Sequence, residues 1–383
     1  MSNIQSQISY PLLPYSQLVF DMQRENPDVY VSRSGIRLYR NDVDLPRLKQ
    51  AISKALLNHP VFFMRVNEEG IQHFEPLSDM FHGQYHAVDF VEHDEFVDVW
   101  IQGNRILGDG WSDVLIIKDV MRAYKGEPLS PDLYLEYLQI REEIKKSARY
   151  ETCRQWLLAE FENIQCPFHP KTDKPLDALE IPLEGNWTED YSVLRGAMEK
   201  LSDTKLITLT AIFSLASALA MMEYNNTNEA ALTWAYDGRE TEAEQNIYGS
   251  LHRDIPFRIK VKGERLKLKD ELIREARKQF RDGIAHSIYP FTLTKPYTER
   301  WNYALNVLVQ HTMQEKTIEV PFAFEPVEMV ATQHIAYSLL DVEIYDGTEL
   351  QINYRYSATH YKESSIRRFA ALVRKYVEWL LES

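Results

Sequence analysis

The sequence of 383 residues predicts a mixed α/β (α+β) protein built from two lobes, and three observations support this fold class. The length suits two domains of ordinary size. Helical and strand periodicities alternate along the chain. A polar stretch with three prolines at residues 166–175 interrupts both periodicities and is typical of a linker. We therefore expect an N-terminal lobe at residues 1–165, a linker at 166–180 and a C-terminal lobe at 181–383.

The composition limits the class of partner and the cellular compartment. Apolar residues make up 44% of the chain, which predicts a well-buried interior. The net charge of −14 argues against nucleic acid or an anionic membrane as a partner, because such binding depends on clustered Lys and Arg. Cys153 and Cys166 are the only cysteines, so neither a disulfide framework nor a cysteine-based zinc site is expected. This usage favours a reducing, cytoplasmic location, and we expect no metal.

The N-terminus and the strongest hydrophobic run give no indication of membrane targeting. Residues 1–6 lack the basic region and apolar core of a secretory signal. Residues 206–222 form the most apolar run, but threonines and serines interrupt it, so we expect a buried core helix and no membrane span.

The elements of the first lobe follow from periodicity and cap signals. Apolar residues over 45–56 recur at helical spacing, and Pro60 disfavours continuation of this helix. Residues 61–66 and 96–101 are expected to be extended, the second because of its strand-favouring side chains. A further helix is expected from about residue 113.

Ser112 is the expected N-cap of that helix. The loop at residues 104–110 therefore connects a strand to a helix, which is a usual place to present functional groups.

The second lobe shows the same mixture of elements. The turn sequence at residues 346–347 between two apolar alternating runs is a strong hairpin signal. The expected elements are a helix at 206–222, a strand at 231–236, hairpin strands at 342–344 and 350–354, and a closing helix at 366–380 capped by Ser364 or Ser365.

Residues 104–110 read NRILGDG, which has the frame of the acyltransferase motif HHxxxDG with both histidines replaced. In an amide- or ester-forming acyltransferase, a histidine of near-neutral pKa suits the removal of a proton from the attacking amine or hydroxyl. Arg105 stays protonated at any biological pH, and Asn104 has no titratable group. Either another residue acts as the base or this chemistry does not occur here.

Further segments with family-like sequences occur in a fixed order along the whole chain. These are residues 10–17 (YPLLPYSQ), 48–65, 104–112 with 123–129 (AYKGEPL), 236–239 (YDGR), 248–258 (YGSLHRDIPFR) and 350–369. Together they resemble the condensation domain of nonribosomal peptide synthetases, a member of the chloramphenicol acetyltransferase-like superfamily. An Asn-Thr pair of that family is replaced by Arg253 and Asp254.

The resemblance implies a two-lobed, V-shaped fold in which each lobe has a mixed sheet flanked by helices and an active-site tunnel lies between the lobes. Arg105 stands at the position of the catalytic second histidine, and Asn104 stands at that of the first. Asp109 matches a structural aspartate that forms an ion pair with an arginine. Gly110 matches the glycine that leaves room at the tunnel. The usual arginine position holds Phe63. Arg105 or Arg65 could pair with Asp109, and the sequence does not decide which residue is the partner.

Four further residues are candidates for substrate or tunnel contacts, and each also has a structural interpretation. Trp111 can pack and Ser112 can cap a helix, while Arg239 belongs to the family-like segment YDGR. His252, like His86, is a conceivable substitute base, although one histidine chosen from eleven is more often an ordinary surface or core residue.

Two functional hypotheses follow from the resemblance. In the first, the domain has impaired or altered catalysis and binds an acyl or peptidyl carrier protein, another synthetase domain or a tailoring enzyme. The X domain is a precedent: it carries arginine at the second histidine position and recruits cytochrome monooxygenases, but it has Asp-Asp in place of Asp109-Gly110. In the second, the domain is an active condensing enzyme or N-/O-acyltransferase in which Arg105 and Asn104 stabilise oxyanion charge. Under both hypotheses it binds no cofactor of its own and receives the phosphopantetheine arm of a carrier protein.

Overall fold

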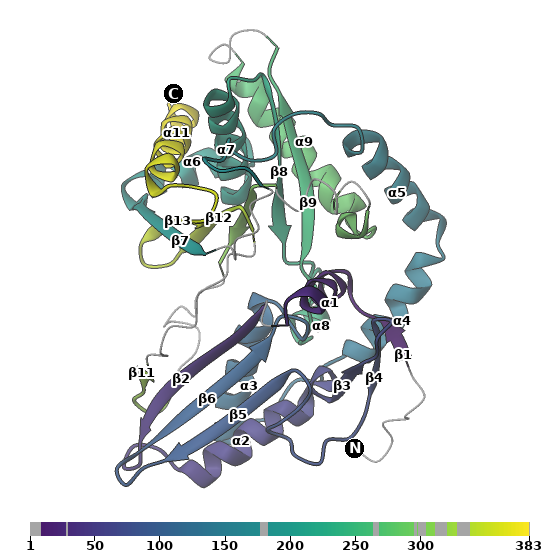
Figure 1. Cartoon of the computed structure of the whole chain (residues 1–383), viewed down its shortest axis with the longest axis vertical. Coiled ribbons are helices and arrows are strands. Elements are labelled where there is room, and N and C mark those ends of the chain that lie inside the picture. The colour runs from purple at the N-terminus through teal and green to yellow at the C-terminus, as the bar shows by residue number, and fades with distance from the viewer. Residues whose placement is uncertain are drawn as a thin grey trace. The chain divides into compact units, whose positions relative to one another are not determined.

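Two separate hydrophobic cores organise the protein. Figure 1 shows the helices and strands that build them. The computed structural model describes residues 9–27, 30–176, 183–262, 268–294, 297, 304–310, 320–327 and 338–382. Their contacts divide the chain into unit 1, with residues 1–143, 237–252 and 313–332, and unit 2, with residues 144–236, 253–312 and 333–383. The contiguous lobes expected from the sequence stay a prediction. The units differ from them because residues 144–165 belong to unit 2, while residues 237–252 and 313–332 belong to unit 1.

Unit 1 contains a four-stranded sheet in the order β11-β2-β6-β5 and a three-stranded sheet in the order β1-β4-β3. All of these strand pairs are antiparallel. The larger sheet packs one face against α2 and α3 around a shared apolar core. The elements are β1 (Ser9–Pro11), α1 (Pro14–Glu25), β2 (Val31–Tyr39), α2 (Leu45–Asn58), η1 (Pro60–Phe63), β3 (Met64–Val66), β4 (Ile71–Phe74), β5 (His86–Glu92), β6 (Phe96–Asn104), α3 (Gly110–Lys125), α4 (Tyr134–Lys145), α8 (Glu242–Gln245) and β11 (Glu325–Val327).

The strand-loop-helix segment forms as expected, but α3 begins at Gly110 and its N-cap is Asp109, so the prediction that Ser112 is the N-cap was wrong. The Asp109 carboxylate accepts the backbone N–H of Ser112 at 3.1 Å, and the Ser112 hydroxyl accepts the backbone N–H of Asp109 at 3.3 Å. A carboxylate is the stronger acceptor and also complements the positive end of the helix dipole, so the cap lies three residues earlier.

The segment after Pro60 also differs from the expectation. Residues 60–63 form a short 3₁₀ turn, and only Met64–Val66 is strand. Proline fits the first position of such a turn. The turn buries the three consecutive side chains of Val61, Phe62 and Phe63, whereas successive side chains of a strand point to opposite faces.

Unit 2 contains a six-stranded mixed sheet in the order β7-β13-β12-β10-β8-β9. Strand β10 runs parallel to β8 and β12, and the other neighbours are antiparallel. Helices α7, α9 and α11 share one apolar core with this sheet. The elements are α5 (Ala148–Phe161), β7 (Glu184–Asp190), η2 (Ser192–Leu194), α6 (Arg195–Lys205), α7 (Leu209–Asn225), β8 (Glu229–Tyr236), β9 (Arg253–Lys260), α9 (Lys269–His286), η4 (Phe291–Leu293), β10 (Asn306–Val309), β12 (Leu340–Asp346), β13 (Leu350–Ser357) and α11 (Glu363–Leu381).

The central helix of unit 2 is buried as expected. Residues 211–222 of α7 are all buried, although the helix begins at Leu209 because Thr208 caps it. Within the described residues, no single helix is long and apolar enough to cross a membrane, while the bent pair Ser192–Lys205 and Leu209–Asn225 reaches that length and apolarity only when taken together.

The hairpin of β12 and β13 is confirmed by their antiparallel register. The expected cap of the closing helix was wrong, because α11 begins at Glu363. Asp173 accepts hydrogen bonds from the backbone N–H of Lys362 at 2.8 Å and from the hydroxyl of Ser365 at 3.0 Å. A carboxylate from the proline-rich segment thus stabilises the helix N-terminus.

Candidate functional site: the NRILGDG loop and its ion-pair network

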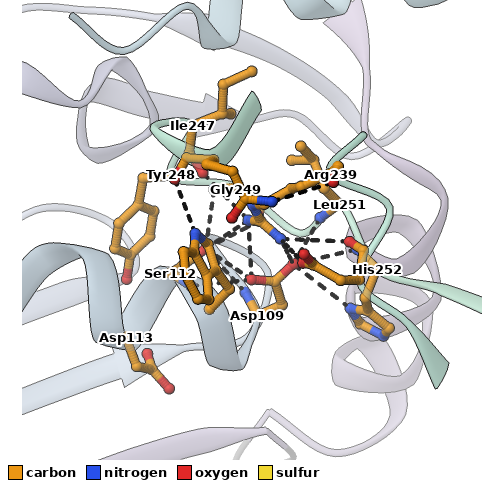
Figure 2. A network of polar contacts seen from close by, with 12 residues as sticks. Asp109, Ser112, Asp113, Arg239, Ile247, Tyr248, Gly249, Leu251 and His252 are labelled. Atoms are coloured by element: carbon orange, nitrogen blue, oxygen red, sulfur yellow. Dashed lines mark hydrogen bonds and ion pairs between the residues drawn. The ribbon is translucent and has the colours of Figure 1, made fainter. Parts of the chain in front are cut away.

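Asp109 and Arg239 form a buried, two-pronged ion pair at the start of α3 (Figure 2). Arg239 Nη1 lies 2.9 Å from Asp109 Oδ2, and Nη2 lies 3.1 Å from Asp109 Oδ1. The side chain of Arg239 is fully buried, and that of Asp109 is nearly so. The expectation that Asp109 pairs with an arginine is therefore confirmed, and its partner is Arg239, neither of the two alternatives Arg105 and Arg65.

Both partners make further hydrogen bonds that fix the adjacent loop. Arg239 donates to the backbone oxygens of Ile247 at 3.2 Å and Gly249 at 2.9 Å, and to the carboxylate of Asp237 at 2.8 Å. Asp109 Oδ2 accepts the backbone N–H groups of Leu251 at 2.9 Å and His252 at 3.2 Å. The network joins the start of α3 to residues 237–252, which explains why that segment belongs to unit 1.

The electrostatics of Asp109 follow from this arrangement. Burial raises the pKa of the Asp109 carboxyl, but the charge and hydrogen bonds of Arg239 outweigh burial and hold the pKa below its ordinary value. Asp109 is thus a permanent anion whose charge is compensated within the protein, which suits a positioning role.

Arg105 lies at the other side of the loop and pairs with Asp113. Its Nη1 is 2.6 Å from Asp113 Oδ2. Both side chains are partly exposed, at 38% for Arg105 and 52% for Asp113. The side chain at the second motif position is therefore an ion-paired, water-accessible guanidinium, which cannot remove a proton.

Asn104 holds the loop against α1. Its side-chain amide and that of Gln23 bond reciprocally, at 3.0 Å and 3.2 Å. The same Asn104 oxygen also accepts the backbone N–H of Ile106 at 3.0 Å. These contacts engage the Asn104 amide in shaping the loop, as short polar side chains often do in turns.

The two glycines of the motif have different surroundings. A Cβ atom on Gly108 would lie 2.7 Å from Ser112 Cβ and 2.8 Å from Tyr248 Cε1, whereas one on Gly110 would meet no atom of the described residues within 4 Å. Gly108, which the sequence reasoning did not single out, is therefore the sterically required glycine.

The remaining predicted site residues of α3 contact residues 237–252. Trp111 Nε1 donates to the backbone oxygen of Gln245 at 2.9 Å. The Ser112 hydroxyl lies 3.0 Å from Asp109 Oδ1 and 3.0 Å from the Gly249 oxygen, and it accepts the Gly249 N–H at 3.1 Å. Both side chains thus tie the two segments of unit 1 together.

His252 lies next to the ion pair in Figure 2. Its Nδ1 is 4.0 Å from Asp109 Oδ2. Its ring packs edge-on against that of Tyr15 on α1, with centroids 3.9 Å apart. The structure therefore brings His252 together with Asp109, Ser112 and Arg239 in one network.

A buried histidine that the sequence reasoning missed lies after α2. His59 is fully buried between two carboxylates: Nδ1 is 2.7 Å from Asp132 Oδ2, and Nε2 is 3.1 Å from Asp119 Oδ2. Burial lowers the pKa of His59, but the hydrogen bonds and charges of Asp119 and Asp132 outweigh burial and raise it above the ordinary value. The sequence indicated His59 only as part of a helix end, and its carboxylate partners are too distant in sequence to be read from periodicity.

Within the described part of the chain, no group of three or more His, Cys, Asp or Glu side chains is arranged to hold a metal ion.

The chain is similar in sequence to proteins of known family. The family model of the condensation domain matches residues 99–383. Nonribosomal peptide synthetase cm3A of Cordyceps militaris is 25% identical over 174 residues, which is 41% of this chain but only 4% of that protein. The chain thus spans a small part of the curated relative.

Solved structures show the same fold at low sequence identity. The cyclization-docking bidomain of the EpoB nonribosomal peptide synthetase from Sorangium cellulosum matches with a TM-score of 0.76 and 13% identity, over 99% of this chain and 85% of that one. The X-domain from teicoplanin biosynthesis matches with a TM-score of 0.76 and 13% identity, over 97% of this chain and 94% of that one.

Proposed function

Because the chain belongs to the condensation domain family, we propose that it binds acyl or aminoacyl thioesters presented by a carrier protein, with catalysis that is impaired or altered. Its chloramphenicol acetyltransferase-like fold is that of condensation domains. The partner is an acyl or peptidyl carrier protein whose phosphopantetheine arm carries the thioester. Another synthetase domain or a tailoring enzyme is the further partner if the domain acts in recruitment.

The observation that carries this proposal is the state of the two motif positions. Arg105 is ion-paired with Asp113, and the Asn104 amide is engaged by Gln23 and Ile106. Neither residue can accept a proton from an attacking amine. The histidine-dependent condensation step of the motif is thus lost, while the Asp109–Arg239 pair still holds the loop.

Binding is tested with a carrier protein that is prepared in its apo form, with phosphopantetheine, and with an alanyl or hexanoyl thioester on that arm. Isothermal titration calorimetry against the full chain should give the highest affinity for the loaded carrier. Equal affinity for the apo and loaded carriers would contradict recognition of the thioester.

Restoration of the motif tests the loss of the histidine step. The double variant Asn104→His with Arg105→His, mixed with loaded carrier and an amine such as alaninamide, should gain amide formation over the parent chain in intact-protein mass spectrometry. The single variant Asn104→His is the matched control, because it leaves arginine at the second position.

The partial exposure of Arg105 supports a second candidate function. A guanidinium that water can reach could stabilise negative charge on a thioester carbonyl oxygen during acyl transfer, with Asn104 as an additional donor. In that case Arg105→Ala should lower turnover while the fold and the affinity for loaded carrier persist. An unchanged turnover in Arg105→Ala would remove this candidate.

A further inference from the structure

His252 lies in direct contact with the loop that lacks both motif histidines. The residue directly precedes β9, and its backbone N–H donates to Asp109 Oδ2 at 3.2 Å. This bond fixes the main chain of His252 beside the carboxylate. The side chain then places Nδ1 4.0 Å from the same oxygen. Figure 2 shows the ring beside the Asp109 carboxylate.

The two ring nitrogens of His252 have different environments. Nδ1 is buried and makes no hydrogen bond, although it faces the Asp109 carboxylate. Nε2 has no hydrogen-bond partner within the described part of the chain, and the side chain remains 19% exposed. A carboxylate near Nδ1 favours the tautomer with the proton on that nitrogen, which leaves Nε2 as the proton acceptor.

The other histidines described in unit 1 lack this combination. Both ring nitrogens of His59 face carboxylates, as do both of His82. His86, the other conceivable substitute base, is nearly buried and bonds through Nε2 to the backbone oxygen of Met80 at 3.1 Å. His73 lies 3.2 Å from Glu75, and His93 lies 3.6 Å from Asp98.

We propose that His252 is the general base of an altered acyl-transfer reaction, supplied by residues 237–252 in place of the missing motif histidine. The proposal rests on the proposed function, because the acyl donor is the carrier-bound thioester. His252 Nε2 takes a proton from an amine acceptor as its nitrogen forms a C–N bond to the thioester carbonyl carbon. The C–S bond then breaks, and the leaving thiolate receives the proton from the imidazolium, which gives an amide and the free thiol of the arm.

Three side chains surround the His252 ring and the carboxylate beside it. They are the Tyr15 phenol on α1 and the Asp109 carboxylate, with the Arg239 guanidinium behind that carboxylate. Asp109 and Arg239 are positioning residues in this reaction.

The test compares the full chain with His252→Gln, which keeps a polar side chain of similar size but cannot accept the proton. Each protein is mixed with a carrier protein bearing an alanyl or hexanoyl thioester and with alaninamide or methylamine, and amide is measured by intact-protein mass spectrometry from pH 5.5 to 9. His93→Gln is the matched control. His93 is 42% exposed and lies just before β6 begins at Phe96, whereas the NRILGDG loop lies where that strand ends. Thermal unfolding and carrier affinity are measured for all three proteins.

We expect His252→Gln to reduce turnover by about 100-fold or more, within the range of general base catalysis, and to keep its affinity for the loaded carrier. Turnover of the parent should rise with pH, because a general base must be unprotonated to act, and this dependence should be absent from the variant. His93→Gln should behave as the parent.

Three results would overturn the inference in distinguishable ways. Equal turnover and the same pH profile in parent and His252→Gln would exclude His252 as base and leave carrier binding intact. Binding of the loaded carrier without amide formation by the parent would exclude the reaction while the binding function stands. A parent that fails to distinguish loaded from apo carrier would contradict the proposed function itself.

Discussion

Asp109 and Arg239 carry opposite charges that compensate each other in the protein interior, and Asp237 provides a second carboxylate to Arg239. Their two contacts, at 2.9 and 3.1 Å, are supplemented by backbone groups of residues 247–252. Arg105 and Asp113 form an ion pair with a shorter contact, but water reaches both side chains. An unpaired charge is costly when it is buried, because it has lost its hydration. Loss of the buried pair should therefore lower the free energy of unfolding much more than loss of the exposed pair.

Substitution of the two aspartates tests this difference. Asp109→Asn removes the buried carboxylate that pairs with both terminal nitrogens of Arg239 and leaves the partly exposed Asp237 as its counter-charge, so it should lower the free energy of unfolding by up to about 3–5 kcal/mol. Asp113→Asn, the matched control, should change it by less than about 1 kcal/mol, because the pair with Arg105 is exposed. Urea unfolding followed by circular dichroism measures both, and equal losses would contradict the assignment.

The two glycines of the loop provide a second residue-level test. Gly108→Ala places a methyl group within 2.8 Å of Ser112 and Tyr248, which should destabilise the protein by about 1–3 kcal/mol. Gly110→Ala meets open space at the first position of α3, where alanine favours the helix, so stability should be unchanged or slightly higher. The midpoints of thermal unfolding distinguish the two variants, and a larger loss in Gly110→Ala would be the contrary result.

At the scale of elements, His59 links segments that secondary structure alone does not join. It follows α2, while Asp119 lies on α3 and Asp132 lies just before α4. The imidazole between the two carboxylates therefore fixes the packing of these helices. Its raised pKa makes this connection dependent on pH.

The sign of that dependence follows from linkage. Unfolded histidine has a pKa of about 6.5, so the extra stability from His59 is fully present below about pH 6.5 and is lost as pH rises through the higher folded value. The difference in unfolding free energy between the parent and His59→Gln should therefore shrink from pH 6 to pH 9. Urea unfolding at each pH provides the measurement. A difference that stays constant would show that His59 does not titrate in this range.

The sequence predicted the order and type of these elements better than their ends. The helix over residues 45–56, the hairpin of β12 and β13, and the strand before the NRILGDG loop all follow from local periodicity and turn chemistry. The cap at Asp109 was missed because Asp109 and Ser112 both fit the cap pattern. The contact of Asp173 with the start of α11 was missed because 189 positions separate Asp173 from Lys362 in the sequence.

The site was predictable to a similar degree. The role of Asp109 in an ion pair could be expected from the family resemblance, and the YDGR segment was noted as a candidate contact. The identity of the partner could not be inferred, because Asp109 and Arg239 are 130 residues apart and no local pattern connects them. The pairing of His59 with Asp119 and Asp132 could not be predicted for the same reason, because these residues are distant in sequence.

At the scale of the whole molecule, unit 1 is discontinuous in sequence. Residues 237–252 contribute Ile247, Tyr248 and Leu251 to the apolar core that the first 143 residues build. The N-terminal lobe expected at residues 1–165 therefore lacks part of its own interior. This interpretation can be tested by truncation.

A fragment of residues 1–165 should lack a cooperative unfolding transition, because it loses three core side chains together with the partner of Asp109. Urea titration followed by tryptophan fluorescence, compared with the full chain, provides the measurement. Addition of a peptide of residues 237–252 should restore part of the native signal. A fragment that unfolds alone with a sharp transition would show that residues 1–165 fold without residues 237–252.

The separation of Asp109 from Arg239 also has a consequence during synthesis of the chain. With translation at about 5–20 residues per second, the 130 residues between them delay Arg239 by roughly 6–26 s after Asp109 has been made. Until then the Asp109 carboxylate has no counter-charge and must remain hydrated. The NRILGDG loop can therefore be built only after most of α7 and β8 have left the ribosome, and a pause in translation before residue 239 would prolong its exposure to chaperones and proteases.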